Sequence, residues 1–225
     1  MTGTKVKICG LFRTEDIGFA NVLRPDYIGF VFAEKSKRYI TPEKAAELRA
    51  MLVSGIRAVG VFVNCEPSFA AGLAEHGVID VIQLHGQEDV EYIRKLRELT
   101  MVPLIQAFQV EGPADLEKAA GSPADLVLLD HGAGGTGQAF DWTLLECGTG
   151  KDADLDSGSG ETGAGCGAGF GRPFFLAGGI NDRNAAEAVK RFRPYALDAS
   201  SGLETDGVKD FVKMERLIKA VRGLT

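Results

Sequence analysis

The sequence predicts an α/β fold of the (β/α)8, or TIM-barrel, class, formed by one domain that spans residues 1–225. Eight apolar runs recur along the chain with helical stretches between them, which is typical of parallel strands covered by helices. The length of 225 residues also falls in the range of single-domain α/β barrels. An open, doubly wound parallel sheet is the alternative, and eight repeated units favour closure. We expect strands at residues 6–9, 27–32, 58–63, 78–84, 102–108, 126–130, 174–177 and 195–198.

Helix start signals follow the first two strands. Thr14 is expected to cap a helix that carries acidic residues in its first turn. Thr41 followed by Pro42 predicts a second helix start, because proline is favoured at the first helical position. Two later helices show apolar stripes that we expect to pack on the barrel, and these consist of Val90, Ile93 and Leu96, and of Phe211, Met214, Ile218 and Val221.

One segment departs from this repeating pattern. Residues 148–172 contain nine glycines, four acidic residues and almost no large apolar side chain. Such a composition buries too little surface to offset the entropy of ordering it. We therefore interpret 148–172 as a flexible insertion within the domain, between a sixth helix that starts near Phe140 and the seventh strand.

Composition disfavours several classes of partner. The net charge of −6 disfavours binding to nucleic acid or to an anionic membrane surface. No apolar run approaches the roughly 20 residues that span a bilayer, and the N-terminus has no signal-peptide pattern, so a cytoplasmic location is expected. The four cysteines show no CxxC pair and no histidine spacing typical of zinc, so we expect reduced thiols and no metal.

Two titratable residues end apolar strands. Cys9 ends the first strand and is followed by Gly10, while Asp130 ends the sixth strand. Side chains at strand ends converge on one mouth of a barrel, where one group could remove a proton and the other donate one. The alternatives are that Cys9 is an inert buried thiol and that Asp130 is a helix cap or orders a loop.

Three strand ends are followed by loops that contain glycine or small polar residues. Glycines allow backbone N–H groups to approach a phosphate, and barrels often bind phosphate after strands seven and eight. Any one loop could simply be an ordinary turn, but three in consecutive positions favour a phosphate site. Its predicted residues are Gly134, Gly135, Thr136 and Gly137, then Gly178, Gly179 and Asn181, then Ser200, Ser201 and Gly202.

These motifs occur in an order that resembles the phosphoribosylanthranilate isomerase family over nearly the whole chain. The 148–172 segment is the main departure. The matching stretches are KICG at 7–10, GFVF at 29–32, SKRYI at 36–40, VGVFVN at 59–64, QLHG at 83–86, LD at 129–130, GGTG at 134–137, FDW at 140–142, AGGIN at 177–181 and DASSGLE at 198–204.

The resemblance implies an Amadori rearrangement of a phosphoribosyl anthranilate in tryptophan biosynthesis, without a cofactor, by an aldose-ketose isomerase of the intramolecular oxidoreductase class. It implies that Cys9 is the general base and Asp130 the general acid, and that Arg38 binds the anthranilate carboxylate. Gln83, His85 and Asp198 are expected at the substrate, although a structural hydrogen bond is an equal alternative for Gln83 and His85.

The expected partner is a small phosphosugar, bound by a monomer or homodimer. Two other functions stay open at this point. A dual-substrate isomerase would also act in histidine biosynthesis, but residues 10–14 and 64–68 offer no second glycine cluster for its phosphate. A non-catalytic phosphosugar-binding barrel would not require both Cys9 and Asp130.

Overall fold

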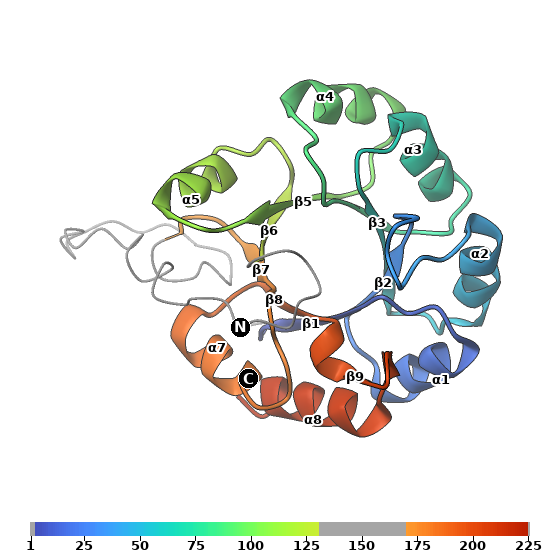
Figure 1. Cartoon of the computed structure of the whole chain (residues 1–225), viewed down its shortest axis with the longest axis vertical. Coiled ribbons are helices and arrows are strands. Elements are labelled where there is room, and N and C mark those ends of the chain that lie inside the picture. Colours follow the sequence, from blue (N-terminus) through green and yellow to red (C-terminus); the bar gives the residue numbers. More distant parts are fainter. Residues whose placement is uncertain (1–2, 131–169, 225) are drawn as a thin grey trace.

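The computed structural model describes residues 3–130 and 170–224, and these residues form a closed barrel of eight parallel strands (Figure 1). Neighbouring strands pair in chain order, and the first pairs with the eighth to close the barrel. The predicted fold class is confirmed. The strands are β1 (Lys5–Cys9), β2 (Tyr27–Val31), β3 (Arg57–Phe62), β4 (Val81–Leu84), β5 (Leu104–Gln109), β6 (Leu126–Asp130), β7 (Phe174–Leu176) and β8 (Ala196–Ala199).

Helices surround the barrel, as Figure 1 shows. They are α1 (Thr14–Leu23), α2 (Pro42–Met51), α3 (Pro67–Glu75), α4 (Val90–Leu99), α5 (Pro113–Ala120), α7 (Ala185–Phe192) and α8 (Phe211–Arg222). The sixth helix expected near Phe140 lies outside the described residues. A short 3-10 helix (Ser201–Leu203) follows β8 and leads into a two-stranded hairpin, β9 (Glu204–Thr205) and β10 (Val208–Lys209), which the sequence did not predict. No helix in the described ranges is long and apolar enough to cross a bilayer.

The start of α2 is as predicted, and the start of α1 is not. The Thr41 hydroxyl oxygen accepts the Lys44 N–H at 3.2 Å and caps α2. At α1, Thr14 is the first helical residue and Arg13 occupies the cap position. The reason is that Asp16 supplies the local acceptor, since its carboxylate takes the Arg13 N–H at 3.1 Å.

Predicted strand limits differ from the structure by up to three residues. The largest difference is at β4, where Val78 and Ile79 are buried but precede the strand. The Val78 N–H donates to the Leu73 carbonyl oxygen and so belongs to a turn. The apolar run therefore begins three residues before the strand that it predicts. In α4, Ile93 and Leu96 pack inward as predicted, but Val90 is 66% exposed.

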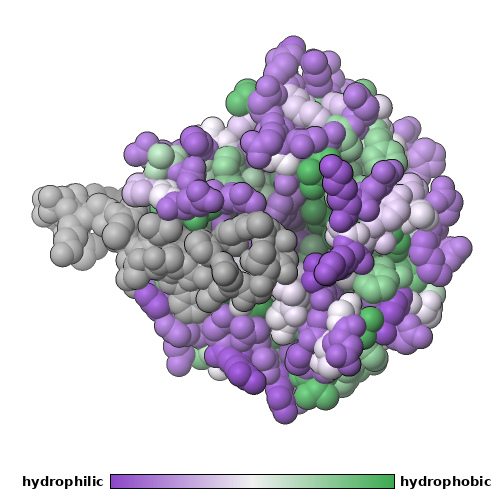
Figure 2. All heavy atoms as spheres, in the orientation of Figure 1, coloured by the Kyte–Doolittle hydropathy of each residue, from purple (hydrophilic) through white to green (hydrophobic). Residues whose placement is uncertain are grey.

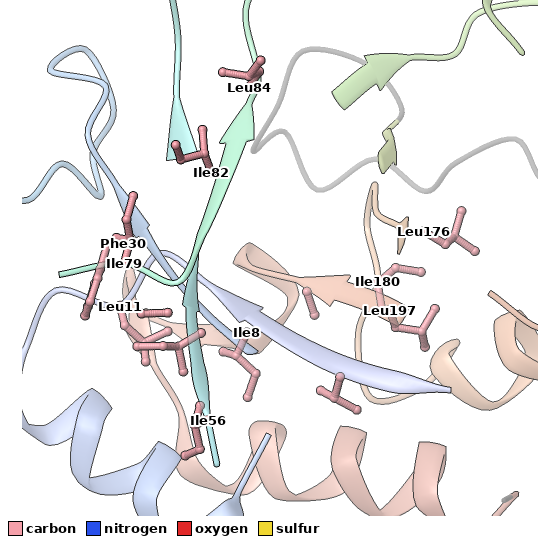
Figure 3. Close-up of a cluster of buried hydrophobic side chains, with 14 of the residues drawn as sticks. Ile8, Leu11, Phe30, Ile56, Ile79, Ile82, Leu84, Leu176, Ile180 and Leu197 are labelled. Carbon is pink, nitrogen blue, oxygen red and sulfur yellow. The ribbon is translucent and has the colours of Figure 1, made fainter. Parts of the chain in front are cut away.

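The barrel strands alternate between two cores. Outward-facing residues such as Ile8 and Leu197 join the layer between strands and helices, which Figure 3 shows in close-up. Inward-facing apolar residues fill the interior, mostly from the first half of each strand: Tyr27, Val59, Val81, Ile105, Leu128, Phe175, Ala177 and Ala196. Polar inward-facing residues lie further along the strands, so the carboxyl end of the barrel interior is polar. Down the barrel, the visible face is mainly hydrophilic, with hydrophobic residues in a hollow near its centre (Figure 2).

The last residues of the predicted insertion are anchored. The Phe170 ring meets the Phe174 ring edge-on, with centroids 5.5 Å apart. The Arg172 guanidinium donates to the carbonyl oxygens of Ser122 at 2.8 Å and Ala124 at 2.6 Å, just before β6. Residues 170–172 of the predicted insertion are therefore packed on the amino-terminal side of the barrel. Residues 148–169 lie outside the described residues.

Candidate active site

Cys9 and Lys7 face the barrel interior from the same strand, because strand residues two apart point to one side. Cys9 is a buried free thiol at the end of β1. Lys7 is completely buried, and its Nζ lies 2.6 Å from Oδ2 of Asp198 on β8, the residue opposite it in the strand register. The other carboxylate oxygen of Asp198 is buried and has no hydrogen-bond partner in the described part of the chain. Asp198 therefore has a free acceptor beside Cys9.

Gly29 makes room for the Cys9 thiol. It lies opposite Cys9 in the register of β1 and β2. A Cβ atom on Gly29 would stand 2.7 Å from the Cys9 sulfur, which is closer than real contacts allow. Any larger residue at this position would displace the sulfur.

Burial and the nearby charges both act on the pKa of the Cys9 thiol. Burial raises the pKa of the Cys9 thiol, and the Asp198 carboxylate acts in the same direction, while the Lys7 and Lys209 ammonium groups lower the pKa. Together, burial and these charges leave the pKa of Cys9 above its ordinary value.

Arg38 is held by a network from the hairpin after β8. Its Nε and Nη2 donate to the two carboxylate oxygens of Glu204 at 2.6 and 2.8 Å. Lys209 Nζ donates to Oε1 of the same carboxylate at 2.6 Å. Burial acts to raise the pKa of Glu204, but the hydrogen bonds from Arg38 and Lys209 outweigh it and lower the pKa. Glu204 is therefore a carboxylate that fixes both cations.

A second polar group comes from β4 and β6. Gln83 Nε2 lies 2.9 Å from His85 Nδ1, and His85 Nε2 lies 3.4 Å from Oδ2 of Asp130. Asp130 ends β6 and is 8% exposed. The side-chain oxygen of Gln83 is buried and has no hydrogen-bond partner in residues 3–130 and 170–224. The structure thus joins Gln83, His85 and Asp130 in one chain of contacts.

The loops after β7 and β8 contact each other. Gly178 and Gly179 adopt positive φ angles of 81° and 68°, and the Asn181 side chain donates to the Gly179 carbonyl oxygen at 2.9 Å. A Cβ atom on Gly202 would overlap the carbonyl group of Ile180. These glycines are therefore required by the turn and by the close approach of the two loops.

Two serines lie at the start of the loop after β8. Ser200 donates its hydroxyl to the Cys9 carbonyl oxygen at 3.0 Å, and Ser201 begins the 3-10 helix. The remaining predicted phosphate residues, Gly134, Gly135, Thr136 and Gly137, lie outside the described residues.

Sequence reasoning missed Lys7, Gly29, Glu204 and Lys209. A signal for Lys7 was present, because a lysine two residues before Cys9 in an apolar strand shares its face. Glu204 and Lys209 carried no such signal.

Within the described residues, no three histidine, cysteine or acidic side chains are placed to hold a metal ion.

Comparison with known proteins identifies the family of the chain. The sequence model described as N-(5'phosphoribosyl)anthranilate (PRA) isomerase matches residues 6–220. The chain belongs to the PRA isomerase family. It is accordingly an isomerase of tryptophan biosynthesis, an aldose-ketose isomerase of the intramolecular oxidoreductase class.

The relatives match over almost their full length. The N-(5'-phosphoribosyl)anthranilate isomerase of Endomicrobium trichonymphae is 42% identical over 98% of this chain and 99% of its own. The PRA isomerase crystal structure from Thermotoga maritima is 34% identical, with a TM-score of 0.82 over 98% of this chain and 99% of that chain. A further PRA isomerase structure, 34% identical with a TM-score of 0.79, holds reduced 1-(o-carboxyphenylamino)-1-deoxyribulose 5-phosphate and covers 98% and 99% of the two chains.

Proposed function

We propose that Cys9 and Asp130 act as base and acid in the rearrangement of N-(5'-phosphoribosyl)anthranilate to 1-(2-carboxyphenylamino)-1-deoxyribulose 5-phosphate. The observation that carries the proposal is their position. Both side chains stand at the carboxyl ends of barrel strands, on β1 and β6, which β7 and β8 separate. Barrel enzymes place their chemistry at this end. The related structure with the reduced product analogue supports the choice of substrate.

The proposed reaction needs one proton donated and one removed. Asp130 protonates the ring oxygen, the bond from C1 to that oxygen breaks, and the anthranilate nitrogen lone pair forms a Schiff base with C1. The Cys9 thiolate then removes the proton from C2, and the electron pair moves to give an enamine that tautomerises to the ketone. C1 is reduced and C2 is oxidised within one molecule, so the reaction needs no external oxidant or cofactor.

Arg38 is proposed to bind the anthranilate carboxylate without leaving Glu204. A guanidinium has five N–H donors, and Glu204 occupies two of them, on Nε and Nη2. The edge formed by Nη1 and the second Nη2 hydrogen is a further two-pronged donor that suits a planar carboxylate. Glu204 therefore orients Arg38 while leaving this edge for the substrate.

The remaining predicted residues are assigned to the sugar and its phosphate. The unpartnered oxygens of Asp198 and Gln83 are acceptors that ribose hydroxyls can satisfy, with His85 beside Gln83. The phosphate is assigned to the contacting loops after β7 and β8, together with the glycines at 134–137.

We also propose a cytoplasmic location and a monomeric or homodimeric state. The PRA isomerase of Thermotoga maritima is dimeric, and a related structure holds monomers generated from it.

The test is turnover by purified protein, followed as loss of substrate fluorescence. Cys9→Ala and Asp130→Asn should each lower kcat by about 10²–10⁴-fold, the usual contribution of a general acid or base, with less effect on substrate binding. Near-normal kcat for Cys9→Ala would require a different base. Failure of the folded wild type to turn over would favour a binding protein, and turnover of the histidine-pathway aminoaldose would favour a dual-substrate isomerase. Complementation of a tryptophan auxotroph tests the function in the cell.

A further inference from the structure

We propose that Lys7 is a positioning residue for the reaction: its ammonium group, divided between Asp198 and the Cys9 sulfur, favours ionisation of that sulfur to the thiolate that removes the proton. The inference rests on the proposed role of Cys9 as base, since a base must first lose its own proton. It adds a second role for Asp198, which competes with Cys9 for the Lys7 charge.

The geometry places Lys7 between the two acidic groups. Lys7 and Cys9 project from β1 to the same side, roughly 6.6 Å apart along the strand at about 3.3 Å per residue. Asp198 lies opposite Lys7 on β8 and accepts its Nζ at 2.6 Å. Lys7 is completely buried, so water cannot share its charge. The ammonium therefore acts on its protein neighbours alone.

The ionisation of Lys7 reflects both neighbours. Burial disfavours its charge, but the Asp198 carboxylate and the Cys9 sulfur outweigh burial and raise the pKa of Lys7 above its ordinary value. Lys7 is thus charged at neutral pH. The two neighbours of Cys9 act on it in opposite directions. Lys7 lowers the pKa of the thiol, and Asp198 raises it.

Two other cations act on the Cys9 sulfur, and both are paired with Glu204. Lys209 of β10 also favours the thiolate, but its Nζ is bound to the Glu204 carboxylate at 2.6 Å and to the Ser200 carbonyl oxygen at 3.1 Å. Arg38, which follows β2, also interacts with the Cys9 charge, and it is paired with the same Glu204. Among these charged groups, Lys7 and then Asp198 have the largest effects on the ionisation of Cys9, ahead of Lys209.

The experiment measures the ionisation of Cys9 without substrate. In full-length protein with Cys65, Cys147 and Cys166 replaced by serine, the rate of iodoacetamide alkylation is followed against pH. Lys7→Met should move the alkylation midpoint to higher pH by about one unit, a tenfold loss of thiolate at a given pH. Asp198→Asn should move it to lower pH, because Lys7 then has only the sulfur as its acidic partner. Lys7→Arg should stay near the wild type, since it keeps the charge.

Lys5 provides the matched control. It lies two residues before Lys7 on the same strand, and its Nζ donates to the Tyr195 hydroxyl at 2.8 Å at the other end of the barrel. Lys5→Met should leave the midpoint unchanged. If Lys7→Met does not fold, the opposite shift in Asp198→Asn still tests the proposal.

A purely structural role for the pair predicts a different result. Lys7→Met and Asp198→Asn both break the same ion pair, so they would then shift the midpoint in the same direction or not at all. That outcome, or an unshifted Asp198→Asn, overturns the proposal. Because alkylation needs no turnover, this failure is distinct from failure of the proposed function, which the activity of Cys9→Ala decides.

Discussion

Arg38 and Glu204 form a two-pronged ion pair, with Nε to Oε1 at 2.6 Å and Nη2 to Oε2 at 2.8 Å, between residues 166 positions apart. Gly10, beside Cys9, has a φ of +79°, and a Cβ there would overlap the Arg38 side chain. Arg38 is thus held on two sides. The Gly10 backbone packs closely against its side chain, and the Glu204 carboxylate binds its guanidinium. This arrangement orients a cation that the proposed substrate requires.

We expect Glu204→Gln to weaken substrate binding through Arg38. The amide offers only one acceptor oxygen, so Arg38 loses half of its two-pronged anchor. KM should rise several-fold in steady-state kinetics, with kcat changed less, and Arg38→Ala should raise KM further. Arg38→Lys is the matched variant that keeps the charge but not the fork, and it should resemble Arg38→Ala more than the wild type. An unchanged KM for Arg38→Ala would remove Arg38 from the binding site.

The stabilising effect of Glu204 should vanish in acid. Its pKa is lowered in the folded protein, so its contribution is complete above the unfolded value of about 4.3 and is lost as pH falls through the folded value. Denaturant unfolding should show Glu204→Gln destabilised by roughly 1–2 kcal/mol at neutral pH, with the difference shrinking below about pH 4.3. Glu47→Gln, which removes an exposed pair with Lys44, should change stability by less than about 1 kcal/mol at any pH. A pH-independent difference for Glu204→Gln would contradict the assignment.

Gly29→Ala should reduce activity by moving the Cys9 sulfur. The new methyl group would need the space that the sulfur occupies, so the thiol or strand must shift, at a cost of roughly 1–3 kcal/mol in stability. kcat should fall at least tenfold. The control is Gly18→Ala on α1, where no atom lies within 4 Å of the added carbon, and it should be neutral or slightly stabilising with normal kcat. Normal kcat in Gly29→Ala would show that the Cys9 position is not critical.

Replacing residues 148–169 with a short Gly-Asn-Gly connector should leave kcat/KM within a few-fold. The segment contains almost no large apolar residue, and its downstream end leads into Arg172, which binds carbonyl groups on the amino-terminal side of β6. Shortening a flexible loop changes closure entropy by only about 0.6 kcal/mol per halving. Arg172→Ala should cost more stability than this deletion in thermal unfolding. A large loss of kcat/KM with the fold intact would place the segment at the substrate.

The sequence by itself determined the repeating architecture and the strand-end positions of Cys9 and Asp130. These follow from local chemistry, because apolar periodicity fixes which segments become strands and two-residue alternation fixes the face of each side chain. Only the tertiary structure decided the partners: Asp198 for Lys7, Glu204 for Arg38 and His85 for Asp130. Barrel closure sets the register of β1 against β8, and the hairpin after β8 reaches the loop after β2, so residues distant in the chain meet. No local pattern encodes such a register, since it depends on how all eight strands pack together.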